Sequence, residues 1–173
     1  MDYTIIREGT YVEAFPFFLD WFPDTTAVEL PGDGPVAWTS RAELGEATAR
    51  VLLDDTDRFR NDKIVLTAQE ALDLRGVARV VGQSLGREIA FSVVSLDDYL
   101  RRKVGRDGVP ESLARAWAST YAGLVLGEGA TVSPLLEELL GRQPTPASQW
   151  IAATLAANPR YTWHQQGGDA GKH

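Results

Sequence analysis

Cysteine is absent from the 173 residues, and histidine occurs only twice. Without cysteine the chain cannot form a disulfide scaffold, a Cys-ligated zinc site or a thiol nucleophile. One of the two histidines is the last residue, which leaves too few imidazoles for a His-based metal site. We therefore expect no metal, and the sequence offers no candidate catalytic side chain.

Positive charge is also in short supply, with 17 Lys and Arg against 24 Asp and Glu and a net charge of -7. This balance gives no electrostatic footprint for nucleic acid or for an anionic lipid surface. The sequence has no apolar run of about 18 residues, and its first residues do not follow the pattern of a secretory signal. We expect a soluble, cytoplasmic protein that binds neither nucleic acid nor membranes.

The composition is that of an ordinary globular domain, with 44% hydrophobic and 24% charged residues. We expect one domain over residues 1–160. The last residues, 161–173, are mostly polar and glycine-rich, and we expect them to form a disordered tail.

The first expected strand comes almost at once, at residues 3–6, where Ile5 and Ile6 are adjacent. Two apolar neighbours break the alternation of a half-buried strand and are typical of a strand buried on both faces in a parallel sheet. Such a strand needs neighbours on both sides. We therefore expect its sheet partners to lie in residues upstream of this chain.

Strands and helices alternate over the next eighty residues, which indicates an α/β fold. A capping box at Ser40 and Glu43 predicts a helix from there, and a second box at Thr67 and Glu70 predicts a helix that ends at Gly86. Further strands are expected over residues 36–39, 63–67 and 88–94.

The remainder of the chain is expected to be helical. Ser95 is placed to cap a short helix through Leu100, and Pro110 opens a longer one. That longer helix carries Leu113, Trp117, Tyr121 and Leu124 at helical spacing, which we interpret as a core-facing stripe. Ser-Pro and Thr-Pro pairs at 133–134 and 145–146 open two more helices.

Two catalytic motifs occur by chance. Residues 82–86 match G-x-S-x-G, but they lie at the end of a predicted helix and not between a strand and a helix, as a nucleophile elbow requires. Tyr99 and Lys103 have the Tyr-x-x-x-Lys spacing of short-chain dehydrogenases. We interpret Tyr99 as a core residue beside a solvated basic surface at 101–103. No G-x-G-x-x-G or P-loop is present.

Aromatic residues are dense between residues 10 and 22, namely Tyr11, Phe15, Phe17, Phe18, Trp21 and Phe22. Pro16 prevents a long helix there. The segment is either a loop packed on the core or the wall of an aromatic ligand pocket.

Four segments, in this order and spacing, resemble the NmrA-like proteins, which are atypical short-chain dehydrogenases/reductases. Residues 4–13 resemble the family's T-I-L-R-x-G-x-x-x-E-N, residues 32–44 its G-x-G turn, strand and Arg-led helix, residues 65–72 its L-T-G-x-E-A, and residues 140–144 its L-G-R-x-P. Ala14 replaces the family's Asn. The resemblance covers residues 3–157 and corresponds to the C-terminal half of the family.

The resemblance implies the C-terminal part of an NAD(P)-binding Rossmann-like fold, made of a few late strands and a helical substrate-binding portion. The N-terminal βαβ cofactor unit is absent from this chain. The implied function is a truncated NAD(P)H-dependent oxidoreductase of the quinone-reductase type, inactive alone. Its cofactor would be NADP(H), and its substrate a quinone-like compound or a conjugated carbonyl.

The resemblance also implies that residues 7–18 line the cleft beside the nicotinamide. The candidate pocket residues are Gly9, Thr10, Tyr11, Glu13 and Phe15, with Trp38 and Arg41 as second choices. Each aromatic and charged candidate has a structural alternative: core packing for the aromatic residues and ion pairing for the charged ones.

Two other functions stay open at this point. The chain could be a non-catalytic regulator that senses NADP. Alternatively it could be a stand-alone interaction module that self-associates through an exposed sheet edge.

Overall fold

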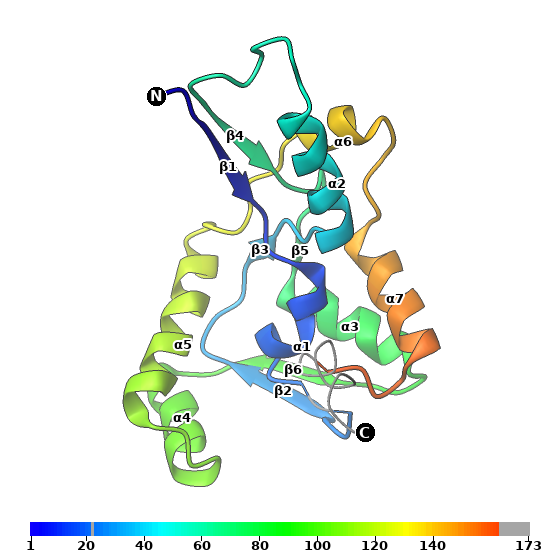
Figure 1. Cartoon of the computed structure of the whole chain (residues 1–173). Coiled ribbons are helices and arrows are strands. Elements are labelled where there is room, and N and C mark those ends of the chain that lie inside the picture. The colour runs from blue at the N-terminus through cyan, green and yellow to red at the C-terminus, as the bar shows by residue number, and fades with distance from the viewer. Residues whose placement is uncertain (22, 163–173) are drawn as a thin grey trace, which may run out of the picture.

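The computed structural model describes residues 1–21 and 23–162 and shows a mixed α/β chain (Figure 1). Within those residues the strands form three two-stranded sheets and no larger sheet. The strands are β1 (Thr4–Glu8), β2 (Ala27–Leu30), β3 (Pro35–Val36), β4 (Asp62–Leu66), β5 (Leu72–Asp73) and β6 (Ala90–Val93).

Helices make up most of the regular structure, as expected for the later part of the chain. They are the 3-10 helix η1 (Val12–Ala14), α1 (Phe15–Phe18), α2 (Arg41–Leu52), α3 (Leu74–Ser84), α4 (Leu96–Leu100), the π-helix η2 (Arg101–Arg106), α5 (Glu111–Val125), α6 (Leu135–Leu140) and α7 (Ala147–Ala157). None of the described helices is long and apolar enough to span a bilayer.

β1 and β4 run parallel, with Ile6 opposite Ile64, and α2 lies between them in the sequence. A parallel sheet was predicted, but its strand partner was expected upstream and is instead β4, later in this chain. Burial of β1 on both faces was also wrong. Ile5 is 42% exposed and Tyr3 just before the strand is 49% exposed, because β4 is the only strand that pairs with β1 in the described part of the chain. The apolar side chains of β4 instead pack under α2 and α6 in a small separate core.

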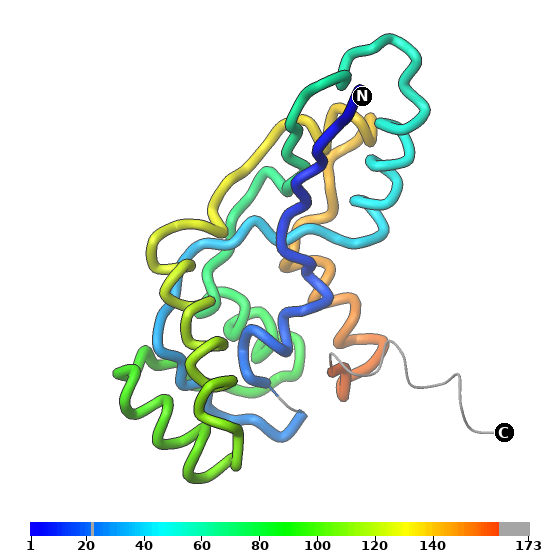
Figure 2. The backbone as a smooth tube through the Cα atoms, turned by 60° about the vertical axis from the view of Figure 1, so that its left-hand side comes forward, coloured from blue at the N-terminus to red at the C-terminus, as the bar shows by residue number. Residues whose placement is uncertain are grey.

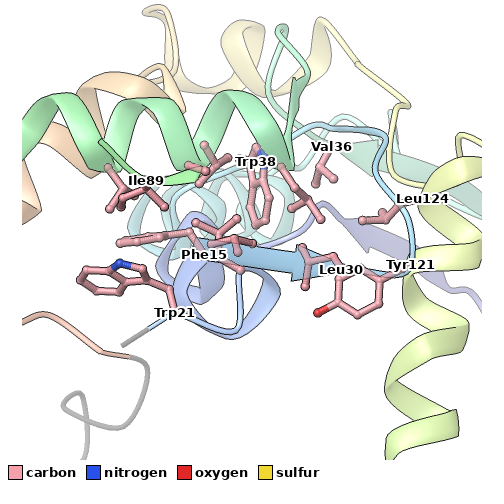
Figure 3. Packing of buried hydrophobic residues seen from close by; sticks show 14 of the residues in the cluster. Phe15, Trp21, Leu30, Val36, Trp38, Ile89, Tyr121 and Leu124 are labelled. Carbon is pink, nitrogen blue, oxygen red and sulfur yellow. The ribbon is translucent and has the colours of Figure 1, made fainter. Parts of the chain in front are cut away.

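The larger core surrounds the second parallel pair, β2 and β6, and α3 directly precedes β6 in the sequence. Val28 and Leu30 alternate with exposed residues along β2 and face inward. Phe15, Trp21, Trp38 and Leu30 belong to this core, and Figure 3 shows Phe15 and Trp38 near α3, Leu30 beside them and Trp21 farther from that helix. The chain as a whole is elongated, with the β1–β4 pair near one end and the hairpin of α4 and α5 near the other (Figure 2).

Most helix boundaries agree with the sequence signals. The Ser95 hydroxyl accepts a hydrogen bond from the Asp98 amide and caps α4, and Gly86 follows α3 with φ at 64°. Pro110 directly precedes α5. The residue pair Thr67 and Glu70 does not start a helix, which was wrong: α3 begins at Leu74, where the Asp73 carboxylate caps the Gly76 amide.

The expected boundary between the domain and its tail, after residue 160, is followed directly by a buried residue, Tyr161. Tyr161 stacks on Phe15 at 5.7 Å between ring centroids and donates its hydroxyl hydrogen to the Glu13 carbonyl oxygen at 3.1 Å. The rest of the expected tail, residues 163–173, lies outside the described residues.

Two glycines give a matched test of this packing. A Cβ atom at Gly34 would lie 2.1 Å from the Leu124 carbonyl oxygen in α5, whereas one at Gly45 in α2 meets nothing within 4 Å. We expect Gly34→Ala to lower the free energy of unfolding by about 1–3 kcal/mol. Gly45→Ala should raise it by about 1 kcal/mol, because alanine favours the helix interior. Urea denaturation of both variants measures this, and equal effects would contradict the close approach of residue 34 to α5.

Candidate functional site

An aromatic pocket of about 400 Å³ lies between the α1 segment and the α4–α5 hairpin. Its volume falls in the range of small-molecule sites. The lining is dominated by aromatic side chains and consists of Pro16, Phe17, Phe18, Asp20, Trp21, Tyr99, Trp117, Thr120, Tyr121 and Thr162.

The first wall is built by the short helix α1 and the turn after it. Pro16 stands in the first turn of α1, where its missing N–H costs nothing. The helix stops after Phe18, and the Trp21 amide returns to the Pro16 carbonyl oxygen at 2.9 Å. Phe17 meets Phe18 edge-on at 5.7 Å between ring centroids. The sequence left two interpretations of this aromatic segment open, a pocket wall or a loop packed on the core. Both apply, because Phe17 and Phe18 line the pocket and Phe15 packs in the larger core.

The second wall is one face of α5. Trp117, Thr120 and Tyr121 lie three and four residues apart and therefore point the same way. Trp117 meets Phe17 edge-on at 6.2 Å, and the Tyr121 hydroxyl donates a hydrogen bond to the Phe18 carbonyl oxygen at 3.1 Å. These contacts fix the two walls relative to each other. The sequence showed the same spacing, but helical periodicity alone does not distinguish a core stripe from a pocket wall.

Tyr99 of α4 lies beside Tyr121, with the two rings 5.9 Å apart and steeply inclined. Burial, with the nearby Asp20 carboxylate as a smaller cause, raises the pKa of Tyr99 to about 12. Burial also raises the pKa of Tyr121. Both phenols are therefore neutral at physiological pH and can serve as hydrogen-bond donors.

Asp20 is the one charged residue among those that line the pocket. Its carboxylate lies 2.6 Å from the Lys103 ammonium and 3.7 Å from the Arg102 guanidinium. The interpretation of Tyr99 as a core residue is confirmed. The expected solvated surface at residues 101–103 is wrong at Arg102 and Lys103, whose side chains are 14% and 6% exposed.

Three of the predicted site residues follow the carboxyl end of β1. The Gly9 amide donates to the Leu66 carbonyl oxygen at 2.8 Å, and the Thr10 carbonyl oxygen accepts from the Thr39 amide at 2.9 Å. Tyr11 is at the surface, where its hydroxyl donates to a Glu8 carboxylate oxygen at 2.9 Å. This hydrogen bond to a carboxylate raises the pKa of Tyr11.

Glu13 is a buried carboxylate at the N-terminus of α2. Both of its oxygens accept from the Arg41 amide, at 3.0 and 3.3 Å. A negative charge is stabilised there by the unpaired amides of the first turn. The expected capping box is therefore wrong in its chemistry, since Ser40 makes no side-chain cap bond and Glu43 turns toward Thr145 and Arg142. The Arg41 guanidinium lies 5.8 Å from the Tyr11 ring centroid.

Phe15 and Trp38 are fully buried in the larger core. Trp38 donates its indole hydrogen to the Leu72 carbonyl oxygen at 2.9 Å and meets Phe18 edge-on at 5.2 Å. The seven predicted site residues thus gather around the end of β1 and the start of α2. None of the seven lines the pocket. Two of them contact residues that do: Phe15 packs against Trp21, and Trp38 packs against Phe18.

The described residues do not fit the pyrophosphate of a dinucleotide. Such a group binds at a helix N-terminus after a strand. Of the helices that follow strands, α2 already holds the Glu13 carboxylate. The Leu74 and Gly76 amides at the start of α3 donate to Asp33 and Asp73. A phosphate at either position would meet a like charge, and so would one at the start of α4, the helix after β6, whose first turn carries Asp97 and Asp98. The described residues also contain no cluster of three acidic or histidine side chains that could hold a metal.

Comparison with known proteins identifies what this architecture resembles. The chain is 36% identical, over 167 residues and 95% of its length, to the NmrA-like family domain-containing oxidoreductase flvB of Aspergillus flavus, of which it covers 54%. The predicted resemblance is thus confirmed, and this chain spans about half the length of that homologue. No protein-family model matches the chain.

Solved structures show the same fold. The NADPH-dependent quinone oxidoreductase QOR2 of Escherichia coli, in complex with NADPH, matches with a TM-score of 0.73 and 23% identity, over 90% of this chain and 54% of that one. The Citrobacter triphenylmethane reductase complexed with NADP(H) matches with a TM-score of 0.71 and 24% identity, over 88% and 53%. The predicted fold class is confirmed: the chain has about half of an NAD(P)-binding reductase fold.

The raised pKa of Tyr99 gives a prediction for alkaline pH. The folded state holds the phenol proton up to about pH 12, whereas the unfolded chain loses it near pH 10.0. The buried neutral phenol of Tyr99 therefore contributes its full share to the free energy of unfolding below pH 10.0, and this contribution is lost as the pH rises toward 12. We expect wild type to lose about 1 kcal/mol relative to Tyr99→Phe between pH 9 and about pH 11. Urea unfolding at both pH values measures the difference, and parallel pH profiles would contradict the burial of this hydroxyl.

Proposed function

We propose that this NmrA-like homologue supplies the substrate-binding half of an NAD(P)H-dependent oxidoreductase that reduces a quinone or another conjugated carbonyl. The observation that carries the proposal is the aromatic pocket, which the fold places directly beside the segment after β1. The names of the similar proteins, a quinone oxidoreductase and a triphenylmethane reductase, support a substrate with conjugated rings. The proposed setting is the cytoplasm.

The chemistry of the pocket suits a flat, conjugated ligand. Phe17 and Trp117 meet edge-to-face and both line the pocket, so a planar ring that lies against this pair can make offset or edge contacts with both side chains. Thr120 and the neutral phenol of Tyr99 add polar groups without charge. A carbonyl oxygen on the ligand can accept a hydrogen bond from such a donor.

The proposed cofactor of the complete reductase is NADP(H), which the NADPH complexes of the solved structures support. Binding of NADP(H) by these 173 residues alone is not part of the proposal. The N-termini of α2 and α3 are occupied by Glu13 and by Asp33 and Asp73, so these two helices offer the pyrophosphate no free site. We therefore propose that the chain alone binds substrate but does not reduce it.

One observation favours a second candidate function, that of an interaction module. The unpaired edge of β1 carries the exposed side chain of Ile5, with Tyr3 next to it. An exposed strand edge can pair with another chain, including a second copy of this one. A dimer whose population rises with concentration and which a proline at Ile5 abolishes would support this candidate.

Quinone binding to the chain alone tests the main proposal. Trp21 and Trp117 line the pocket, so a bound quinone such as menadione should quench the intrinsic fluorescence. We expect saturable quenching by wild type. Thr120 lines the pocket at an exposed position, so Thr120→Arg places a long side chain across the pocket mouth and should weaken binding about tenfold by obstructing entry. Ser119→Arg, at an exposed neighbouring position on α5, is the matched control and should bind as wild type does.

Two outcomes would contradict the proposal. Either wild type shows no saturable quenching, or Thr120→Arg and Ser119→Arg bind menadione equally well. Circular dichroism of both variants confirms that α5 is intact in each case.

A further inference from the structure

The charged end of the pocket is built around Asp20, at the turn that ends α1. Asp20 has a φ of 50°, in the left-handed region that residues other than glycine seldom adopt. Its carboxylate lies 2.6 Å from the ammonium of Lys103, which comes from a distant part of the sequence. The close ion pair offsets the cost of this backbone conformation and of placing a charge beside aromatic rings.

Lys103 stands in the π-helix η2, a rare form of helix that often occurs at functional sites. Its side chain is only 6% exposed, and its ammonium also lies 3.3 Å from the Asp107 carboxylate. The same ammonium is 5.9 Å from the centre of the Trp117 ring. Lys103 therefore contacts Asp20 on the first wall of the pocket and Trp117 on the second.

The charges around Lys103 balance. Arg102 pairs with Glu29 at 2.8 Å and approaches Asp20 at 3.7 Å, and Arg106 pairs with Asp107 at 3.1 Å. Three acidic groups thus face three basic ones: Asp20, Glu29 and Asp107 against Arg102, Lys103 and Arg106. Removal of the Lys103 ammonium leaves one uncompensated negative charge, and Asp20 presents it to the pocket.

We propose that Lys103 is a positioning residue that sets the charge preference of the pocket. Its ammonium, which lies close to both Asp20 and Trp117, cancels the charge of the Asp20 carboxylate, and the pocket therefore selects uncharged aromatic ligands. The inference rests on the proposed function, since it takes the pocket to be the substrate site. Without Lys103, the Asp20 carboxylate and the faces of the aromatic rings would together attract cations.

The test compares three flat probes by fluorescence quenching: neutral menadione, a cationic aminoacridine and anionic anthraquinone sulfonate. For Lys103→Met we expect menadione to bind about tenfold more weakly and aminoacridine about fivefold more tightly than to wild type. For Asp20→Asn the charge preference should reverse. The group around Lys103 then carries one net positive charge. Anthraquinone sulfonate should therefore gain affinity, and aminoacridine should lose it.

Arg101→Met is the matched control. Arg101 begins the same π-helix, but its side chain is 75% exposed and pairs with Asp98 outside the pocket. This variant removes one positive charge from the same turn and should bind all three probes as wild type does. It therefore separates a local effect at the pocket from a change in overall charge.

The outcomes separate the two proposals. If wild type binds menadione but Lys103→Met and Asp20→Asn keep its order of preference among the probes, the inference is overturned and the proposed function stands. A shift of the same size in Arg101→Met would also overturn it. If Lys103→Met does not fold, Asp20→Asn decides by the direction of its shift. If wild type binds none of the probes, the proposed function fails and this inference fails with it.

Discussion

The contact on which the rest of the structure depends is the one between the Glu13 carboxylate and the N-terminus of α2. Glu13 follows the turn after β1, and α2 belongs to the small core under the β1–β4 pair. Its neighbours Val12 and Phe15 belong to the larger core, and its carbonyl oxygen accepts the Tyr161 hydroxyl. One buried residue therefore joins the two cores and fixes the point from which α1 departs. The direction of α1 in turn decides where the aromatic pocket lies.

The same contact bears on which kind of ligand the chain can bind, a dinucleotide phosphate or a flat organic molecule. A carboxylate that already occupies the N-terminus of α2 excludes a phosphate from that position, and Asp33 and Asp73 do the same at α3. The aromatic pocket has no such obstacle, because the charge of Asp20 is balanced from behind by Lys103 and Arg102. In the described part of the chain, the groups suited to a flat organic ligand are thus complete, and those suited to a dinucleotide are not.

Local signals in the sequence predicted the elements well where one residue determines the backbone. Gly86, Ser95 and Pro110 marked helix ends correctly, because a left-handed residue, a side-chain cap and a missing amide act within a few residues. The resemblance to NmrA-like proteins predicted the fold and the half of it that is present. Capping boxes were less informative, since Thr67 and Glu70 offered the pattern but the chain places α3 later.

Only one of the two pocket walls could be predicted from the sequence. The aromatic cluster at residues 10–22 indicated one wall, but Trp117 and Tyr121 lie about a hundred residues further along and have the spacing of any core helix. Lys103 was missed because adjacent basic residues are usually solvated. Its burial depends on Asp20 and Asp107, and the approach of Asp20 is a tertiary contact that no local pattern encodes. Glu13 was selected as a candidate, but its partner in α2 became evident only from the fold.

We propose that this chain holds the substrate pocket of a reductase but not the cofactor site, and calorimetric unfolding with menadione and with NADPH in separate scans distinguishes the two. A ligand that binds only the folded state raises the transition temperature, and the rise grows with the logarithm of the ratio of its concentration to its Kd. The account predicts one cooperative transition that shifts upward with menadione and stays in place with NADPH. An upward shift with NADPH would contradict it, because the chain would then bind a pyrophosphate for which the N-termini of α2 and α3 offer no free site.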